Sequence, residues 1–128
     1  MGYMRHHAII VSTWDEGMLN EAHDIASRIF PVVSDILDSA ENGEKSFFIP
    51  PDGSKEGRQW EASRIGDAHR EEFVEWLIEQ EYEDGSNTLG WVEVQYADDD
   101  LDTRIVRSRD GRSAEAANRR ANDDRPDR

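Results

Sequence analysis

The sequence predicts an α+β fold: a single two-layer α/β sandwich of about four strands and two helices, in the order β-α-β-α-β-β. Three observations predict this order. An apolar run lies near the start of the chain at residues 6–14, two stretches with helical periodicity follow it, and residues 89–107 have the pattern of a hairpin. The length of 128 residues suits one domain with a modest core.

Residues 6–14 are expected to form the first strand. Residues 8–11 are all apolar, which is typical of a strand that is buried on both faces. Thr13 and Glu16 have the spacing of a capping box, so we expect Thr13 to be the N-cap of the first helix. Pro31 is expected to end that helix, because proline interrupts helical hydrogen bonding.

The segment between the two helices leaves alternatives open. Residues 32–42 contain either a short strand or one helical turn capped by Ser34. The Asn-Gly pair at 42–43 predicts a turn. Residues 45–49 predict a short strand, and the proline pair at 50–51 ends it because proline cannot donate to a strand ladder.

The second helix is expected to begin near Ser63 or Asp67 and to continue to about Glu83, with Gly85 as its C-cap. Its core-facing side chains are expected to be Phe73, Leu77 and Trp76, with Val74 and Ile78 at the edge of the stripe.

Residues 89–96 alternate as a strand does, with Val92, Val94 and Tyr96 on one face and Glu93 and Gln95 on the other. An acidic turn at 97–102 and a return strand at 103–107 complete a predicted hairpin. The strand order is not fixed by these patterns. A parallel pairing of the first two strands would require a right-handed crossover.

The sequence predicts that the chain divides into two regions. Residues 1–107 form the predicted α/β domain, and residues 108–128 form a polar tail that contains both acidic and basic residues. Apart from alanine, the tail lacks apolar residues, so we expect it to be flexible.

Composition narrows the classes of function. The net charge is −14, and the first 106 residues carry 24 acidic and eight basic residues, so we expect no direct binding of nucleic acid by the domain. The absence of cysteine excludes disulfides and thiolate metal sites. We expect no signal peptide, because the N-terminus lacks the apolar region of one, and no apolar run reaches membrane-spanning length. We expect an intracellular protein without a membrane segment or a cofactor.

The stretch 50–73 is the first candidate site. It contains four of the eight basic residues and leads into a helix N-terminus, where free N–H groups and the helix dipole favour an anion. The expected ligand is anionic or nucleotide-like, and the candidate residues are Ser54, Lys55, Arg58, Trp60, Arg64 and Arg70. The alternative is a hydrated loop in which the six acidic residues of the same stretch pair with its Lys and Arg side chains.

The histidines suggest a second, metal-based alternative. His6 and His7 are adjacent on a strand and point to opposite faces, so they cannot both bind one ion. His69 and Glu72 are three residues apart on a helix and would form a His/His/carboxylate site with one of them. The competing interpretation is a partly buried His69 beside Phe73. We assign no catalytic residue and no metal site.

Acidic residues form the third candidate surface. They gather on the outer face of the second helix and on the hairpin, at Glu71, Glu72, Glu75, Glu79, Glu81, Glu83, Asp84, Asp98, Asp99, Asp100 and Asp102. Such a surface suits an inhibitor or nucleic-acid mimic that docks on a basic protein. The alternative is that the charge only maintains solubility.

Four segments carry a resemblance: HHAIIVSTWDE, SFFIPPDGSKEG, GDAHREEFVEWL and DGSNTLGWVEVQYADDD. They resemble a family of short hypothetical proteins encoded by tailed phages of actinobacteria, over roughly residues 5–107. The chain departs from the family pattern where Arg58 and Gln59 separate Gly57 from Trp60. The resemblance implies a phage gene expressed in a bacterial cytoplasm and brings no activity with it.

Three hypotheses of function follow. The first is a small cytoplasmic phage protein of the host-takeover or counter-defence type that binds an anionic ligand at residues 50–73. The alternative is an acidic inhibitor, or nucleic-acid mimic, that binds a basic host protein. The third is a metal-dependent hydrolase. The expected partners are a small anion or a host protein, and a homo-oligomer is a further alternative.

Overall fold

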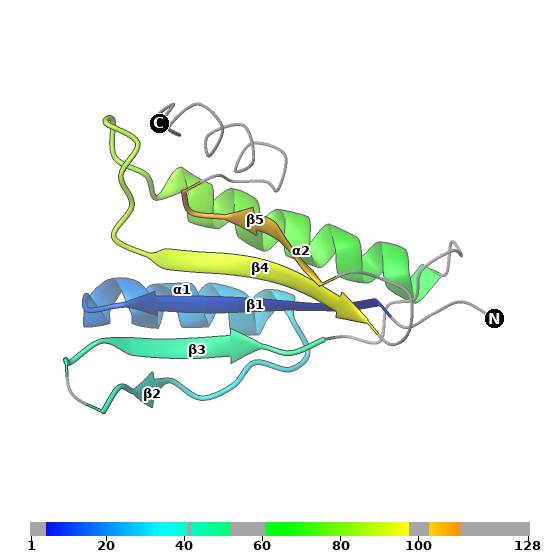
Figure 1. Ribbon diagram of the computed structural model, residues 1–128, viewed down its shortest axis with the longest axis horizontal. Helices are drawn as coiled ribbons and strands as arrows, with labels where there is room; N and C mark the ends of the chain where they lie inside the picture. Colours follow the sequence, from blue (N-terminus) through cyan, green and yellow to red (C-terminus); the bar gives the residue numbers. More distant parts are fainter. Residues whose placement is uncertain (1–4, 41, 52–60, 98–102, 111–128) are drawn as a thin grey trace, which may run out of the picture.

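The computed structural model describes residues 5–40, 42–51, 61–97 and 103–110. Five strands form one sheet, and both helices lie on the same face of it, behind the sheet in Figure 1. The elements in chain order are β1 (Arg5–Thr13), α1 (Glu16–Ile29), β2 (Leu37–Asp38), β3 (Lys45–Ile49), α2 (Glu61–Glu79), β4 (Gly90–Ala97) and β5 (Arg104–Ser108).

All strand pairings are antiparallel, and the strand order is β2-β3-β1-β4-β5. The β-α-β-β-α-β succession from β1 to β4 is the connectivity of ferredoxin-like folds, and β5 extends the sheet beyond β4. The predicted α+β class is therefore confirmed, although the sheet has one strand more than expected. The expected second strand, β3, pairs antiparallel with β1, so the condition for a parallel crossover does not arise.

The hydrophobic core lies between the helices and one face of the sheet. β1 contributes Ile9 to this core, and β3 contributes Phe47. Phe30, at the C-terminal end of α1, contacts Phe73 of α2 edge to face, with ring centroids 5.8 Å apart. The buried core residues are Ile9, Val11, Leu19, Ala22, Ala26, Phe30, Phe47, Ile49, Phe73, Val74, Leu77, Leu89 and Trp91. Phe73 and Leu77 thus face the core, as predicted.

The face of β1 turned away from the helices is only partly buried, because Ala8 there is 3 % exposed while Ile10 is exposed, so the prediction of a strand buried on both faces is wrong. Ile9 is fully buried, whereas its neighbour Ile10 is 42 % exposed. The apolar run is continuous, but both helices pack on the same side of the sheet, which leaves Ile10 and the other even-numbered residues of β1 facing away from the helices.

β4 alternates as predicted, and it turns its more polar face toward the helices. Trp91, Glu93 and Gln95 are buried, while Val92 and Val94 are only partly buried on the opposite side. The register decides this arrangement, because Ile9 pairs with Glu93 and Ile10 pairs with Val92.

Asp15 is the N-cap of α1, so the predicted capping box with Thr13 as N-cap is wrong. The Asp15 carboxylate accepts a 3.1 Å hydrogen bond from the backbone N–H of Met18. Thr13 still belongs to β1, and its hydroxyl accepts a 3.1 Å hydrogen bond from the Asp15 N–H. The helix ends at Ile29, two residues before Pro31, as predicted.

Ser34 ties the connection after α1 to β3 instead of capping a helical turn. Its backbone N–H donates to the Phe48 carbonyl at 2.9 Å, and its hydroxyl accepts from the Phe48 N–H at 2.8 Å. Of the two alternatives for residues 32–42, the strand is correct, although β2 has only two residues. Gly43 has φ of 75°, which fits the predicted turn.

α2 ends at Glu79, earlier than predicted, and Gly85 is not its C-cap. Gly85 has φ of 86° and belongs to a later turn, in which its N–H donates to the Tyr82 carbonyl at 2.8 Å. Among the described residues, no helix has both the length and the apolar composition needed to cross a membrane. The loop at 52–60, the acidic residues 98–102 and the tail from 111 to 128 lie outside the described residues.

Candidate functional site

Glu93 of β4 places a carboxylate on the helix side of the sheet, where its side chain is only 1 % exposed. Glu93 Oε2 lies 2.7 Å from His7 Nδ1 of β1, and Oε1 lies 2.7 Å from both Nε and Nη2 of Arg107 on β5. Arg70 of α2 adds a third partner, with its Nε 3.7 Å from Oε2. A buried charge is tolerated when it is paired and hydrogen-bonded, and both oxygens of Glu93 meet that condition.

The environment keeps Glu93 ionised. Burial raises the pKa of its carboxyl group, but the hydrogen bond from His7 and the positive charge of Arg107 lower it by more, so the pKa lies below its usual value of 4.5. Burial lowers the pKa of Arg107, and the charge of Glu93 reverses this and raises the pKa. The two groups therefore stabilise one another's charged forms.

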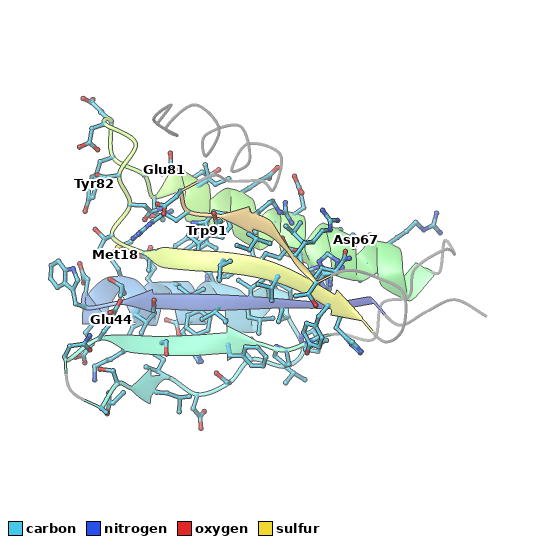
Figure 2. All side chains as sticks on the ribbon, viewed as in Figure 1. Met18, Glu44, Asp67, Glu81, Tyr82 and Trp91 are labelled. Carbon is cyan, nitrogen blue, oxygen red and sulfur yellow. The ribbon has the colours of Figure 1, made fainter. Side chains whose placement is uncertain are left out.

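Two further carboxylates of α2 complete this buried charge cluster. Arg107 Nη1 donates to Glu71 Oε2 at 2.6 Å, and Arg70 forms an ion pair with Asp67, which is labelled on α2 in Figure 2. Among the described residues, three carboxylates thus oppose two guanidinium groups, so this part of the cluster does not offer a surplus positive charge to an anion. Its evident role is to attach β1, β4 and β5 to α2.

His7 contributes one ring nitrogen, Nδ1, to this cluster. An ionised carboxylate only accepts hydrogen bonds, so Nδ1 carries the hydrogen of this contact. His7 Nε2 is buried and has no hydrogen-bond partner among the residues that the structure describes. A carboxylate that orients an imidazole also occurs in catalytic and metal sites. Within the described ranges, however, no three His, Cys, Asp or Glu side chains are grouped as a metal site requires.

The four metal candidates point in different directions. His6 lies on the sheet face opposite His7, as predicted, with its ring 5.0 Å from that of Tyr96. His69 contacts Phe30 edge to face at 6.0 Å, which agrees with the interpretation of a partly buried histidine. Glu72 is exposed on α2.

The described members of the predicted anion site do not share a surface. Arg64 is exposed on α2, whereas Arg70 is 3 % exposed and is paired with Asp67 and Glu93. The other four candidates, Ser54, Lys55, Arg58 and Trp60, lie outside the described residues.

A groove of about 260 Å³ lies between α1 and α2, and we call it the acidic groove. Its lining consists of Ile25, Ile29, Glu72, Glu75, Trp76 and Glu79. No hydrogen bond or ion pair joins the three glutamates to another described residue. The Trp76 ring stacks on Phe73, with 6° between the ring planes, so core packing sets its orientation.

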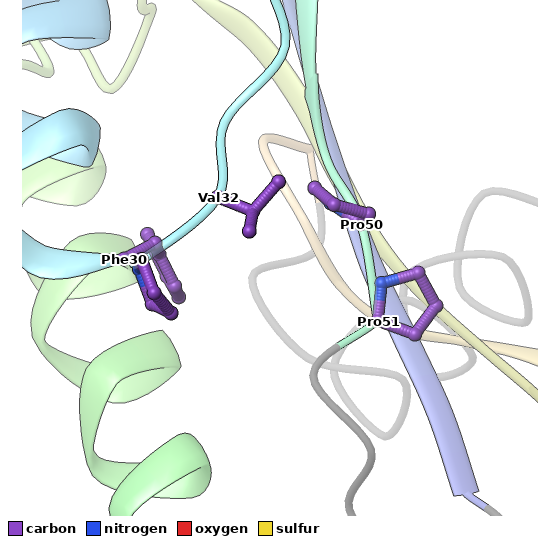
Figure 3. Close-up of a pocket in the computed structure, with 5 residues that line it drawn as sticks. Phe30, Val32, Pro50 and Pro51 are labelled. Carbon is purple, nitrogen blue, oxygen red and sulfur yellow. The ribbon is translucent and has the colours of Figure 1, made fainter.

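A second hollow, of about 230 Å³, lies where the chain leaves α1 and β3 (Figure 3). Its lining consists of Phe30, Pro31, Val32, Pro50 and Pro51. These side chains are all apolar and provide no hydrogen-bonding group that would orient a ligand. We assign no site to this hollow.

The sheet face turned away from the helices carries no charged side chain in the strands. We call this surface the open sheet face, and it consists of His6, Ala8, Ile10, Ser12, Leu37, Ser46, Phe48, Val92, Val94, Tyr96, Ile105 and Ser108. The charged strand residues whose side chains are described, including Lys45, Glu93 and Arg107, occupy the helix-side register.

Sequence reasoning missed the cluster around Glu93 and the open sheet face, and it predicted the three glutamates of the acidic groove but not the concavity that they line. One signal for the cluster was present in the hairpin, because Glu93 and Gln95 alternate with valines while Arg104 and Arg107 lie on the return strand opposite them. Glu93 and Arg107 form a cross-strand pair of opposite charge, which favours a shared face. The groove and the open face depend on how helices pack, which no local pattern encodes.

Comparison with known proteins identifies no relative of this chain. The chain matches no protein-family model, and no curated protein or solved structure is significantly similar to it.

Proposed function

We propose that this protein acts by binding another protein, and that its acidic groove holds a basic segment of that partner. One observation carries the proposal. Three carboxylates without a described cationic partner and one oriented tryptophan ring line the same concavity, Glu72, Glu75 and Glu79 around Trp76.

The chemistry of the groove suits an arginine or lysine side chain. A cation above an indole ring is attracted by the negative face of the ring, and carboxylates accept its N–H groups. Ile25 and Ile29 supply apolar surface for the methylene stem of the same side chain. Arginine is favoured because its planar guanidinium stacks on an aromatic ring and still donates to carboxylates at its edge.

The whole-chain charge supports the same class of partner. A net charge of −14 attracts a basic surface over a distance and repels an acidic one. The proposal thus takes up the inhibitor hypothesis and gives it a defined surface. The anion-binding hypothesis at residues 50–73 stays a prediction, because four of its six residues lie outside the described ranges and Arg70 is paired with carboxylates.

The cellular setting is also a proposal. The resemblance to phage proteins favours a bacterial host protein as the partner, in the host cytoplasm, and a role in host takeover or counter-defence. What supports this is the sequence resemblance together with the acidic surface.

Calorimetric titration with an acetylated oligo-arginine peptide at low salt tests the groove. The wild-type chain is expected to bind the peptide, and the triple variant Glu72→Gln, Glu75→Gln, Glu79→Gln is expected to bind it roughly tenfold more weakly or worse. The matched control carries the same charge change at exposed positions outside the groove: Asp24→Asn, Asp35→Asn, Glu83→Gln.

The control separates a site from overall charge. Equal losses in the two triple variants would show that only net charge attracts the peptide, and the groove proposal would then be wrong.

A third set of variants tests the contribution of the Trp76 ring. Trp76→Phe is expected to keep most of the affinity and Trp76→Leu to lose roughly two- to fivefold, because only an aromatic face attracts the cation.

A further inference from the structure

We propose that the open sheet face is a homodimer interface, on which a second copy of this chain packs sheet against sheet. Figure 1 shows this face turned to the viewer, with both helices on the far side. The inference goes beyond the proposed function and does not rest on it, because the acidic groove lies between the helices, on the opposite layer.

The composition of the face is the first argument. Charged residues make up 34 % of the chain, yet none occurs at the open-face positions of the strands. Ile10, Phe48 and Val92 lie directly opposite one another across β3, β1 and β4. Five of the nine exposed large apolar side chains in the described part of the chain belong to this face: Ile10, Leu37, Phe48, Tyr96 and Ile105. A contiguous exposed apolar surface of this kind marks an interaction site.

Net charge opposes contact between two copies wherever charged surfaces meet, which leaves the uncharged open sheet face as the surface on which a second copy can pack. Two chains of net charge −14 repel each other wherever their acidic surfaces meet, and the exposed side of α2 presents Glu71, Glu72, Glu75 and Glu79. The open sheet face opposes no like charges when it meets its own copy, and it buries no unpaired charge. The same patch on both subunits is what a two-fold dimer requires.

Other occupants fit this surface less well. Beyond Ser108 the chain has no apolar residue except alanine, so its own tail lacks the side chains to cover an apolar sheet. Nucleic acid is disfavoured as well, because the protein is strongly acidic and the strands carry no Lys or Arg on this face to contact phosphates.

The dimensions agree with a small interface. Five strands about 4.8 Å apart make the face about 20 Å wide, and the lengths of β1 and β4 make it about 25 Å long. Packed sheets lie about 10 Å apart with their strands aligned to within about 30°. The resulting dimer would have helices on both outer layers, so both acidic grooves would stay accessible.

Light scattering coupled to size-exclusion chromatography tests the proposal on the full chain, from about 1 µM to about 300 µM. The wild type is expected to approach twice the chain mass of 14.7 kDa as the concentration rises. Ile10→Lys is expected to shift the mass to that of one chain. The matched control is Ile65→Lys on α2, which has the same charge change and a similar exposure, 48 % against 42 % for Ile10, and is expected to remain dimeric.

A second measurement does not depend on a destabilising change. The chain contains no cysteine, so Ser12→Cys places a single thiol on the open sheet face and Ser27→Cys places one on exposed α1. A bismaleimide is expected to cross-link the first variant to a dimer and to leave the second monomeric.

Three results would overturn the proposal. A wild-type chain that stays monomeric throughout would leave a different protein, or other parts of this chain, as the occupant of the face. A dimer that survives Ile10→Lys with unchanged affinity would place the interface elsewhere. Cross-linking of Ser27→Cys in preference to Ser12→Cys would place it on the helix layer.

Discussion

Two guanidinium nitrogens of Arg107, Nε and Nη2, both lie 2.7 Å from the same carboxylate oxygen of Glu93. The third nitrogen of the guanidinium, Nη1, donates to Glu71 on α2 at 2.6 Å. One side chain from the edge strand β5 is thereby bound to the neighbouring strand and to a helix. β5 has no buried apolar residue of its own, so among the described residues this contact is the principal attachment of β5 to the helix layer.

Arg107→Met is expected to lower the free energy of unfolding by about 3 kcal/mol, because it leaves Glu93 buried with less positive charge around it. Arg104→Met on the same strand is the matched control. Arg104 is exposed and reaches Gln95 only at 3.4 Å, so its loss is expected to change stability by less than about 0.5 kcal/mol. Chemical denaturation of both variants measures the difference. Equal losses would show that Arg107 is not a special attachment.

The ionised state of Glu93 predicts how stability responds to acid. Its pKa is lowered in the folded state, so below about pH 4.5 the unfolded chain binds a proton that the folded chain still excludes. This contribution is fully present above the usual pKa of 4.5 and is lost as the pH falls through the lower, folded value. The free energy of unfolding is therefore expected to decrease as the pH falls below about 4.5.

Glu93→Gln isolates that contribution. The variant is expected to lose about 3 kcal/mol at neutral pH, because Arg107 and Arg70 lose a buried counter-charge. It is also expected to show a weaker decline than the wild type below about pH 4.5. Urea denaturation at a series of pH values supplies both quantities. Parallel curves for the two proteins would contradict the assignment of a lowered pKa to Glu93.

The N-terminus of α1 offers a direct choice between the predicted and the observed cap. Asp15→Ala is expected to cost about 1 kcal/mol, because the Met18 N–H loses its acceptor. Glu16→Ala would cost a similar amount only if the capping box that the sequence suggested were present; in this structure it is expected to cost a few tenths of a kcal/mol. Thermal unfolding of the two variants separates the cases, and a larger loss for Glu16→Ala would favour the capping box.

Local sequence patterns predicted where the helices and strands lie more accurately than they predicted which side chains are buried. Residues 45–49 and the hairpin around residues 89–107 follow from strand alternation and turn residues, which act over a few positions. Which side chains are buried could not be predicted from these local patterns. The apolar run of β1 gives no sign that Ile10 faces away from the helices, because that depends on where two distant helices pack.

The buried charge cluster shows the same limit at the level of the site. Alternation in β4 separates Glu93 from Val92 but does not say which of them faces inward. That choice depends on His7, Arg70 and Arg107, which come from three other elements. Basic residues in the 50–73 stretch suggested a free positive surface, but in the structure Arg70 is paired with the buried carboxylate of Glu93 and the exposed one of Asp67. Charge counted along a chain does not reveal which charges are already neutralised.

The short outer strands limit how copies of this protein can assemble. β2 has two residues and β5 has five, and a bulge between Glu93 and Val94 interrupts the β4–β5 pairing. Short and irregular edges are poor templates for strand addition, so lateral growth into open-ended fibrils is disfavoured at both borders. In the proposed dimer each open sheet face is covered by the other, so this mode of association would stop at two chains.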